Sequence, residues 1–104
     1  MVKSQETGKN RDEGKEKYIL SLFITGMTPN SLSAVGNIKA ICEKYLKSRY
    51  ELEIIDTYQQ PDLALTENLI AIPVLIKRFP LPESRMIGDL SNIAEVLSGL
   101  SLIN

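Results

Sequence analysis

The chain has 104 residues, of which 43% are hydrophobic and 24% charged, and its formal net charge at pH 7 is −1. This length and composition are typical of one globular domain with a single core. The near-neutral charge disfavours nucleic acid as the main partner, and the lack of an 18-residue apolar run predicts that no helix spans a membrane.

Residues 1–17 form a charged segment in which five basic residues nearly balance four acidic ones. Beyond Met1 and Val2 the segment has no apolar side chain, so it cannot contribute to a core. We therefore predict a flexible tail over residues 1–17 and a domain over residues 18–104. A signal peptide would need an apolar stretch here, and a lone cysteine suits a reducing compartment, so we expect a cytoplasmic protein.

The first half of the domain predicts a strand, a helix and a second strand. Residues 18–25 are almost continuously apolar, as in a strand that is buried on both faces. Thr28 is a suitable N-cap for a helix that has Pro29 at its first position and ends near Ser48. Residues 50–58 begin with alternating polar and apolar side chains, which predict a second strand. A strand–helix–strand order favours parallel pairing of the two strands.

The second half gives mixed signals. Pro61 begins a short helical pattern, and residues 71–79 resemble a strand except that Pro73 removes a backbone donor. A turn with two prolines precedes a brief strand over residues 85–87. Ser91 is then the expected N-cap of a last helix. The predicted order is β-α-β-α-β-β-α in an α/β fold with a mixed sheet.

This order resembles the thioredoxin fold. Thioredoxins carry a reactive Cys pair at the turn that spans residues 25–31 here, and a cis proline, in whose place Pro73 stands, faces that turn. The corresponding turn in this chain contains no Cys, His or Lys. We interpret it as a vestigial thioredoxin site, which comprises Gly26, Thr28, Pro29, Asn30 and Ser31.

Other residues offer little chemistry. Cys42 lies on the apolar stripe of the first helix, which favours a buried, unreactive thiol over a redox group. The absence of His excludes a His base or His metal ligand. Glu51 and Glu53 share one strand face while Asp56 has the opposite parity, so a solvated face is favoured over a metal site. We expect no catalytic residue, no metal and no cofactor, and hence no enzyme.

Three basic residues, Lys77, Arg78 and Arg85, lie on the two strands that the proline-containing turn joins. The sequence predicts that these residues lie close together. Positive charge on an edge hairpin deters edge-to-edge pairing, and it also suits an acidic partner surface. Both interpretations stay open at this point.

Four segments resemble the KaiB family of clock proteins: TGMTPNS (25–31), LEIID (52–56), AIPVL (71–75) and RMIGDLSN (85–92). The resemblance extends over residues 18–102. It implies a non-enzymatic protein that binds the N-terminal ATPase ring of KaiC, antagonises KaiA and times the phosphorylation cycle of KaiC. It also implies that Lys77 and Arg85 contribute to the partner surface.

The family resemblance further implies two folds. One is a tetrameric ground state with a rearranged C-terminal half, and the other is a monomeric thioredoxin-like state that binds KaiC. The segment with mixed local signals, residues 57–102, coincides with the half that rearranges. Pro73, Gly88 and Asp89 are the candidate residues for the switch and its turn.

Departures from the family pattern affect the expected partners. Ser33 and Ser84 stand where cyanobacterial relatives carry Arg, and Glu51 and Glu53 stand where they have a neutral and a basic residue. The acidic replacements disfavour KaiA as a partner. A KaiC-like ATPase in a clock-like or stress-adaptation system is favoured. The alternatives are a sensing or scaffold domain for a signalling histidine kinase and a monothiol redox protein that uses Cys42.

Overall fold

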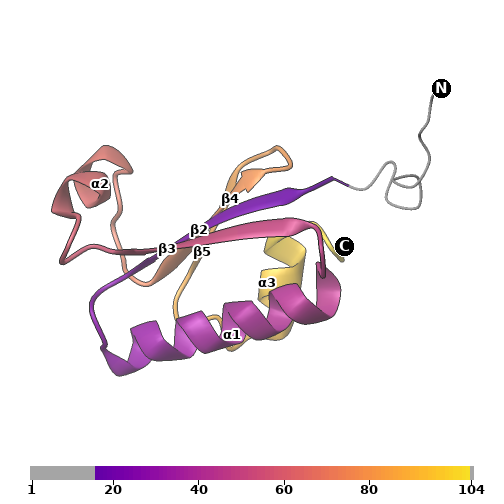
Figure 1. Cartoon of the computed structure of the whole chain (residues 1–104), viewed down its shortest axis with the longest axis horizontal. Coiled ribbons are helices and arrows are strands. Elements are labelled where there is room, and N and C mark those ends of the chain that lie inside the picture. Colours follow the sequence, from indigo (N-terminus) through magenta and orange to yellow (C-terminus); the bar gives the residue numbers. More distant parts are fainter. Residues whose placement is uncertain (1–15, 104) are drawn as a thin grey trace.

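The computed structural model describes residues 16–103 and confirms the predicted order of elements (Figure 1). In chain order these elements are β2 (Tyr18–Ile24), α1 (Pro29–Tyr45), β3 (Tyr50–Asp56), α2 (Pro61–Thr66), β4 (Val74–Phe79), β5 (Ser84–Ile87) and α3 (Ile93–Gly99). The predicted tail falls almost entirely outside the described residues and stays a prediction. Within residues 16–103, no helix has the length and apolar character needed to cross a bilayer.

The four strands form one mixed sheet in the order β3-β2-β4-β5, as expected for a thioredoxin-like fold. β2 pairs with β3 in parallel, with Tyr18 opposite Tyr50. β4 runs antiparallel to both β2 and β5. β3 and β5 are therefore the two edges of the sheet.

Helices α1 and α3 lie on one face of the sheet, and α2 lies near one end of the opposite face (Figure 1). The main core fills the space between the sheet and α1 with α3. The Tyr18 hydroxyl donates a hydrogen bond to the Leu100 carbonyl at 2.7 Å, which ties the first strand to the end of the last helix. The buried members of this core are Tyr18, Leu20, Leu22, Ala34, Ile38, Ile41, Cys42, Leu46, Leu75, Leu90, Val96, Leu97 and Leu100.

A smaller apolar cluster occupies the other face of the sheet. Phe23, Ile55, Val74 and Ile76 form this cluster. The α2 segment packs against it through partly buried leucines but has no fully buried residue of its own. This segment is therefore held less firmly by apolar burial than α1 or α3.

Element boundaries differ from the predictions at three places. α1 ends at Tyr45 instead of near Ser48, whose φ of 69° is incompatible with a continuing helix. β4, predicted over residues 71–79, begins at Val74, because Pro73 before it has no N–H to donate to the ladder. β3, predicted over residues 50–58, ends at Asp56, where the chain turns.

The N-cap of α3 is Asn92 and not the predicted Ser91. The Asn92 side chain accepts a hydrogen bond from the Glu95 backbone N–H at 3.2 Å. Ser91 instead donates its backbone N–H to the Asp89 carboxylate at 3.0 Å. Both residue types are good caps, so composition alone did not distinguish them.

Candidate functional site

The turn between β2 and α1, where thioredoxins carry their reactive thiols, is stabilised by its own backbone and hydroxyl groups. Thr28 is the N-cap of α1 as predicted, with its hydroxyl accepting from the Ser31 backbone N–H at 3.3 Å. The Thr28 hydroxyl donates to Ser31 Oγ at 2.8 Å, and the Thr25 backbone N–H donates to the same oxygen at 3.0 Å. Ser31 is fully buried, so its hydroxyl serves this network and does not face solvent.

Gly26 has a φ of 53°, in the left-handed region that favours glycine. Its backbone N–H donates to Asp56 Oδ1 at 3.0 Å, and a Cβ at this position would lie 3.0 Å from the Tyr58 ring. Asp56 also accepts from the Tyr58 backbone N–H at 2.9 Å. Asp56 therefore anchors the turn to the end of β3, a role that sequence reasoning missed because it considered only a metal or acid–base role.

A shallow hollow of about 410 Å³ lies beside this turn, lined by Thr25, Thr28, Pro29, Asn30 and Ile72. The peptide bond between Ile72 and Pro73 is cis, so this proline has the conformation expected from the thioredoxin plan. Pro29 and Asn30 are exposed, and neither side chain brings a nucleophile or a base to the hollow. Its lining contains no Cys, Lys or acidic side chain and can contact another protein.

Cys42 is fully buried within the main core, as predicted. Burial, with a smaller contribution from the Glu43 carboxylate, raises the pKa of its thiol to about 12. A thiol with such a pKa is almost entirely protonated near neutral pH and is a poor nucleophile. Thiol–disulfide exchange at this residue is therefore disfavoured by both access and ionisation.

The acidic residues Glu51 and Glu53 of β3 lie on a solvent-exposed face of the strand. Glu51 and Glu53 are exposed on the edge strand, and Glu51 pairs with Lys17 at 2.7 Å. Within residues 16–103, no group of three potential ligands is close enough to hold a metal ion. The exposure of Glu51 and Glu53 agrees with the solvated strand face that the sequence predicted.

The three basic residues separate into two environments. Lys77 is only 1% exposed, and its Nζ donates to Ser101 Oγ at 3.1 Å on the face that α3 covers. Arg78 points to the opposite face, because neighbouring residues in a strand alternate. The predicted three-residue cluster is therefore wrong for Lys77. Sequence reasoning gave no reason to expect a long basic side chain among core residues.

Arg78 and Arg85 do come together, and Glu67 at the C-cap of α2 joins them. Arg78 makes two hydrogen bonds to the Glu67 carboxylate, at 3.0 and 2.9 Å, and pairs with Glu83 at 3.3 Å. The Arg85 guanidinium lies 3.6 Å from the same Glu67 carboxylate. We call these four residues the arginine–glutamate network. The hydrogen bonds from Arg78 hold the pKa of Glu67 below its ordinary value.

The Gly88-Asp89 turn joins β5 to the loop before α3. Gly88 has a φ of 112°, in the left-handed region that favours glycine. The Asp89 carbonyl accepts from the Asn37 side chain of α1 at 2.8 Å. Hydrogen bonds from Ser91 lower the pKa of the Asp89 carboxyl group. The turn is thus positioned by contacts on both sides, and its role in a fold switch stays a prediction.

The chain has a thioredoxin-like fold in which the turn at residues 25–31 contains no cysteine. Among solved structures, the N-terminal domain of SasA from Synechococcus elongatus superposes with a TM-score of 0.68 at 21% identity, covering 100% of this chain and 95% of that one. Mitochondrial thioredoxin 3 from Saccharomyces cerevisiae superposes with a TM-score of 0.67 at 13% identity, covering 86% and 81%. At these identities the likeness establishes the fold alone.

Sequence comparison goes further. Residues 21–102 match the model of the KaiB domain. The circadian clock oscillator protein KaiB of Prochlorococcus marinus subsp. pastoris is 44% identical over 89 residues, which are 86% of this chain and 83% of that protein. The circadian clock protein KaiB3 of Synechocystis is 42% identical over 87 residues, 84% and 85% of the two chains. The chain therefore belongs to the KaiB family.

Proposed function

We propose that this chain is a non-enzymatic regulatory protein that binds a KaiC-like ring ATPase and modulates its ATPase and phosphorylation cycle, in a clock-like or stress-adaptation system. The similarity to KaiB proteins that are named clock oscillator proteins carries the proposal. The internally bonded turn at Thr25–Ser31 and the buried Cys42 agree with docking in place of redox chemistry. The tetrameric second fold and the disfavoured binding of KaiA remain predictions.

The partner surface proposed from the sequence needs one change. Lys77 is buried against α3, so it supports the fold and does not meet a partner in this state. Arg78 and Arg85 have side chains that are 29% and 37% exposed, and both share the carboxylate of Glu67. A partner carboxylate can approach Arg85 more easily, because Arg85 has only the longer 3.6 Å contact with Glu67. We therefore assign the larger electrostatic contribution to Arg85.

Size-exclusion chromatography with light scattering tests the proposal. The purified protein is mixed with the KaiC-like ATPase of the same organism in the presence of ATP or ADP. We expect a complex larger than the ATPase ring in at least one nucleotide state. The absence of a complex in both states would contradict the proposed function.

Charge reversal then tests the proposed surface. Arg85→Glu is expected to weaken the complex by more than tenfold, because it places a negative charge beside Glu67 and opposite an acidic partner. Lys39→Glu, which reverses an exposed charge on α1, is the matched control and should leave binding within about twofold of wild type. If Arg85→Glu and Lys39→Glu change binding equally, the ATPase binds to another surface of the protein. The ATPase would still be the partner in that case.

A further inference from the structure

Within residues 16–103, no strand pairs with the outer edge of β5. The Gly88 backbone N–H donates to the Pro73 carbonyl at 2.9 Å, and Met86 lies opposite Leu75 in the same antiparallel ladder. In such a ladder, alternate residues bond to the neighbouring strand and the residues between them face away from it. The N–H and C=O groups of Arg85 and Ile87 therefore point to the open edge of the sheet.

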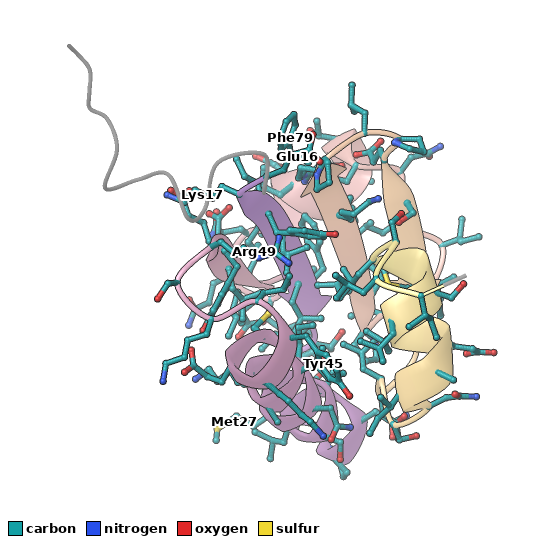
Figure 2. All side chains as sticks on the ribbon, turned by 90° about the vertical axis from the view of Figure 1, so that its right-hand side faces the viewer. Glu16, Lys17, Met27, Tyr45, Arg49 and Phe79 are labelled. Carbon is teal, nitrogen blue, oxygen red and sulfur yellow. The ribbon has the colours of Figure 1, made fainter. Side chains whose placement is uncertain are left out.

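A groove runs between this edge and α3, which lies beside β5 (Figure 2). The two elements touch at one end, where the Ser84 hydroxyl donates to the Gly99 carbonyl at 2.7 Å. A cavity of about 540 Å³ lies between the two elements and the Gly88-Asp89 turn. Partly buried Met86 and buried Val96 give the groove an apolar floor. An extended chain beside β5 could thus hydrogen-bond to the edge and place a side chain over that floor.

The charge along this groove is negative. Residues 86–103 include Asp89 and Glu95 but no Lys or Arg. Glu95 is exposed and lines the cavity, and it makes no ion pair with the residues that the structure describes. Arg85 also borders the groove, but its side chain lies on the sheet face opposite to α3, because Arg85 alternates with Met86 along the strand. Asp89 and Glu95 therefore give the α3 side of the groove a negative charge, which is complementary to a basic segment.

We propose that β5 and α3 form a docking groove for an extended, basic segment of a partner protein, which adds to the sheet as an antiparallel strand next to β5. The partner residue opposite Met86 faces the groove, because side chains opposite one another lie on the same face. An apolar side chain suits this position. A Lys or Arg two residues earlier lies opposite Gly88 and reaches Glu95 and Asp89. This mode of recognition uses backbone hydrogen bonds for affinity and alternate side chains for specificity.

This inference does not rest on the proposed ATPase partner, and its test needs no ATPase. The probe is a fluorescein-labelled nine-residue peptide of threonines with a central leucine and a lysine two positions before it. Fluorescence anisotropy measures its binding to the full chain. A second peptide with glutamate in place of the lysine is the control. We expect saturable binding of the lysine peptide and at least tenfold weaker binding of the glutamate peptide.

Two variants of the protein locate the binding. Ile87→Pro removes a donor that faces the open edge while leaving the bonds to β4, and it should weaken binding at least tenfold. Glu95→Lys reverses the acidic wall and should have an effect of similar size. Glu53→Lys makes the same charge change on the opposite edge strand and should leave binding unchanged. If circular dichroism shows that Ile87→Pro is unfolded, the comparison of Glu95→Lys with Glu53→Lys decides whether the peptide binds in the groove.

Three outcomes would overturn the inference. The first is no anisotropy change of the labelled peptide up to millimolar protein, and the second is equal weakening by Glu95→Lys and Glu53→Lys. The third is concentration-dependent self-association of the wild type that Ile87→Pro abolishes, which would make a second copy of this chain the occupant of the edge. Docking of the peptide at the edge of β5 would be supported by peptide-induced shifts of the Arg85 and Ile87 amide resonances without comparable shifts in β3.

Discussion

Gly88 and Gly36 differ in backbone conformation. At both positions an added Cβ would have no neighbouring atom within 4 Å. Gly88 has a φ of 112°, which side chains other than glycine rarely adopt, whereas Gly36 is an exposed residue inside α1. The effect of an added methyl group at these two positions therefore depends on the backbone conformation and not on packing.

We predict that Gly88→Ala lowers the free energy of unfolding by about 1–2 kcal/mol. The matched change Gly36→Ala should raise it by roughly 0.5–1 kcal/mol, because alanine favours the helix. Chemical denaturation measures both. Gly88→Ala should also shift the balance between the two folds that the family resemblance implies. Unchanged NMR spectra and an unchanged oligomer size in that variant would contradict the role given to this turn.

Cys42 gives a second test at the residue scale. Because burial raises the pKa of its thiol from 9.0 to about 12, iodoacetamide at pH 8 should label it only after denaturation. The folded state retains this proton at pH values where the unfolded state has lost it. Stability is therefore expected to decrease as the pH rises above 9 and approaches 12. Rapid labelling of the native protein would revive the redox alternative.

At the scale of elements, the arginine–glutamate network connects α2 to the β4–β5 hairpin. Glu67→Gln keeps the shape of the side chain but removes its charge. We expect it to lower the free energy of unfolding by roughly 1 kcal/mol, since the network is partly exposed. Glu53→Gln, on the exposed edge of β3, is the control and should change stability little. Urea denaturation at neutral pH compares the two, and equal stabilities would show that the network contributes nothing measurable.

The same network predicts a pH dependence in the acid range. The pKa of Glu67 is lowered from its ordinary value of 4.5, mainly by hydrogen bonds from Arg78. Its contribution to stability is therefore present above pH 4.5 and is lost as the pH falls through the lower pKa of the folded state. The difference in stability between wild type and Glu67→Gln should shrink in this range. A constant difference between pH 7 and pH 3 would contradict this assignment.

The elements that the sequence predicted well are those with a regular apolar period and a local cap. The Thr28–Pro29 start of α1 depends on residues next to one another, so its signal is contained in the sequence. Contacts between residues that are distant in the sequence could not be predicted in this way. Glu67 meets Arg78 and Arg85 only after α2 folds over the sheet, and Lys77 reaches Ser101 only after α3 has packed. Alternation along β4 places Lys77 and Arg78 on opposite faces of the sheet, and the predicted cluster did not take this into account.

At the scale of the whole molecule, the two faces of the sheet are covered unequally. α1 and α3 bury most of the apolar side chains on one face, while the other face has a four-residue cluster and the arginine–glutamate network. Local stability follows buried apolar contact, so the α2 segment is expected to open more readily than α1. Hydrogen exchange should show faster exchange for amides of residues 61–66 than for those in the middle of α1. Equal protection of the two helices would contradict this expectation.

The absence of thiol chemistry in a thioredoxin-like fold is tested most directly by disulfide reduction. The purified protein is incubated with insulin and dithiothreitol, and precipitation of the reduced chains is followed by turbidity, with a thioredoxin as the positive control. We predict the rate seen without added protein, because the turn at residues 25–31 has no cysteine and Cys42 is buried. A reproducible rate above that background, lost in Cys42→Ala, would contradict a docking protein without redox activity.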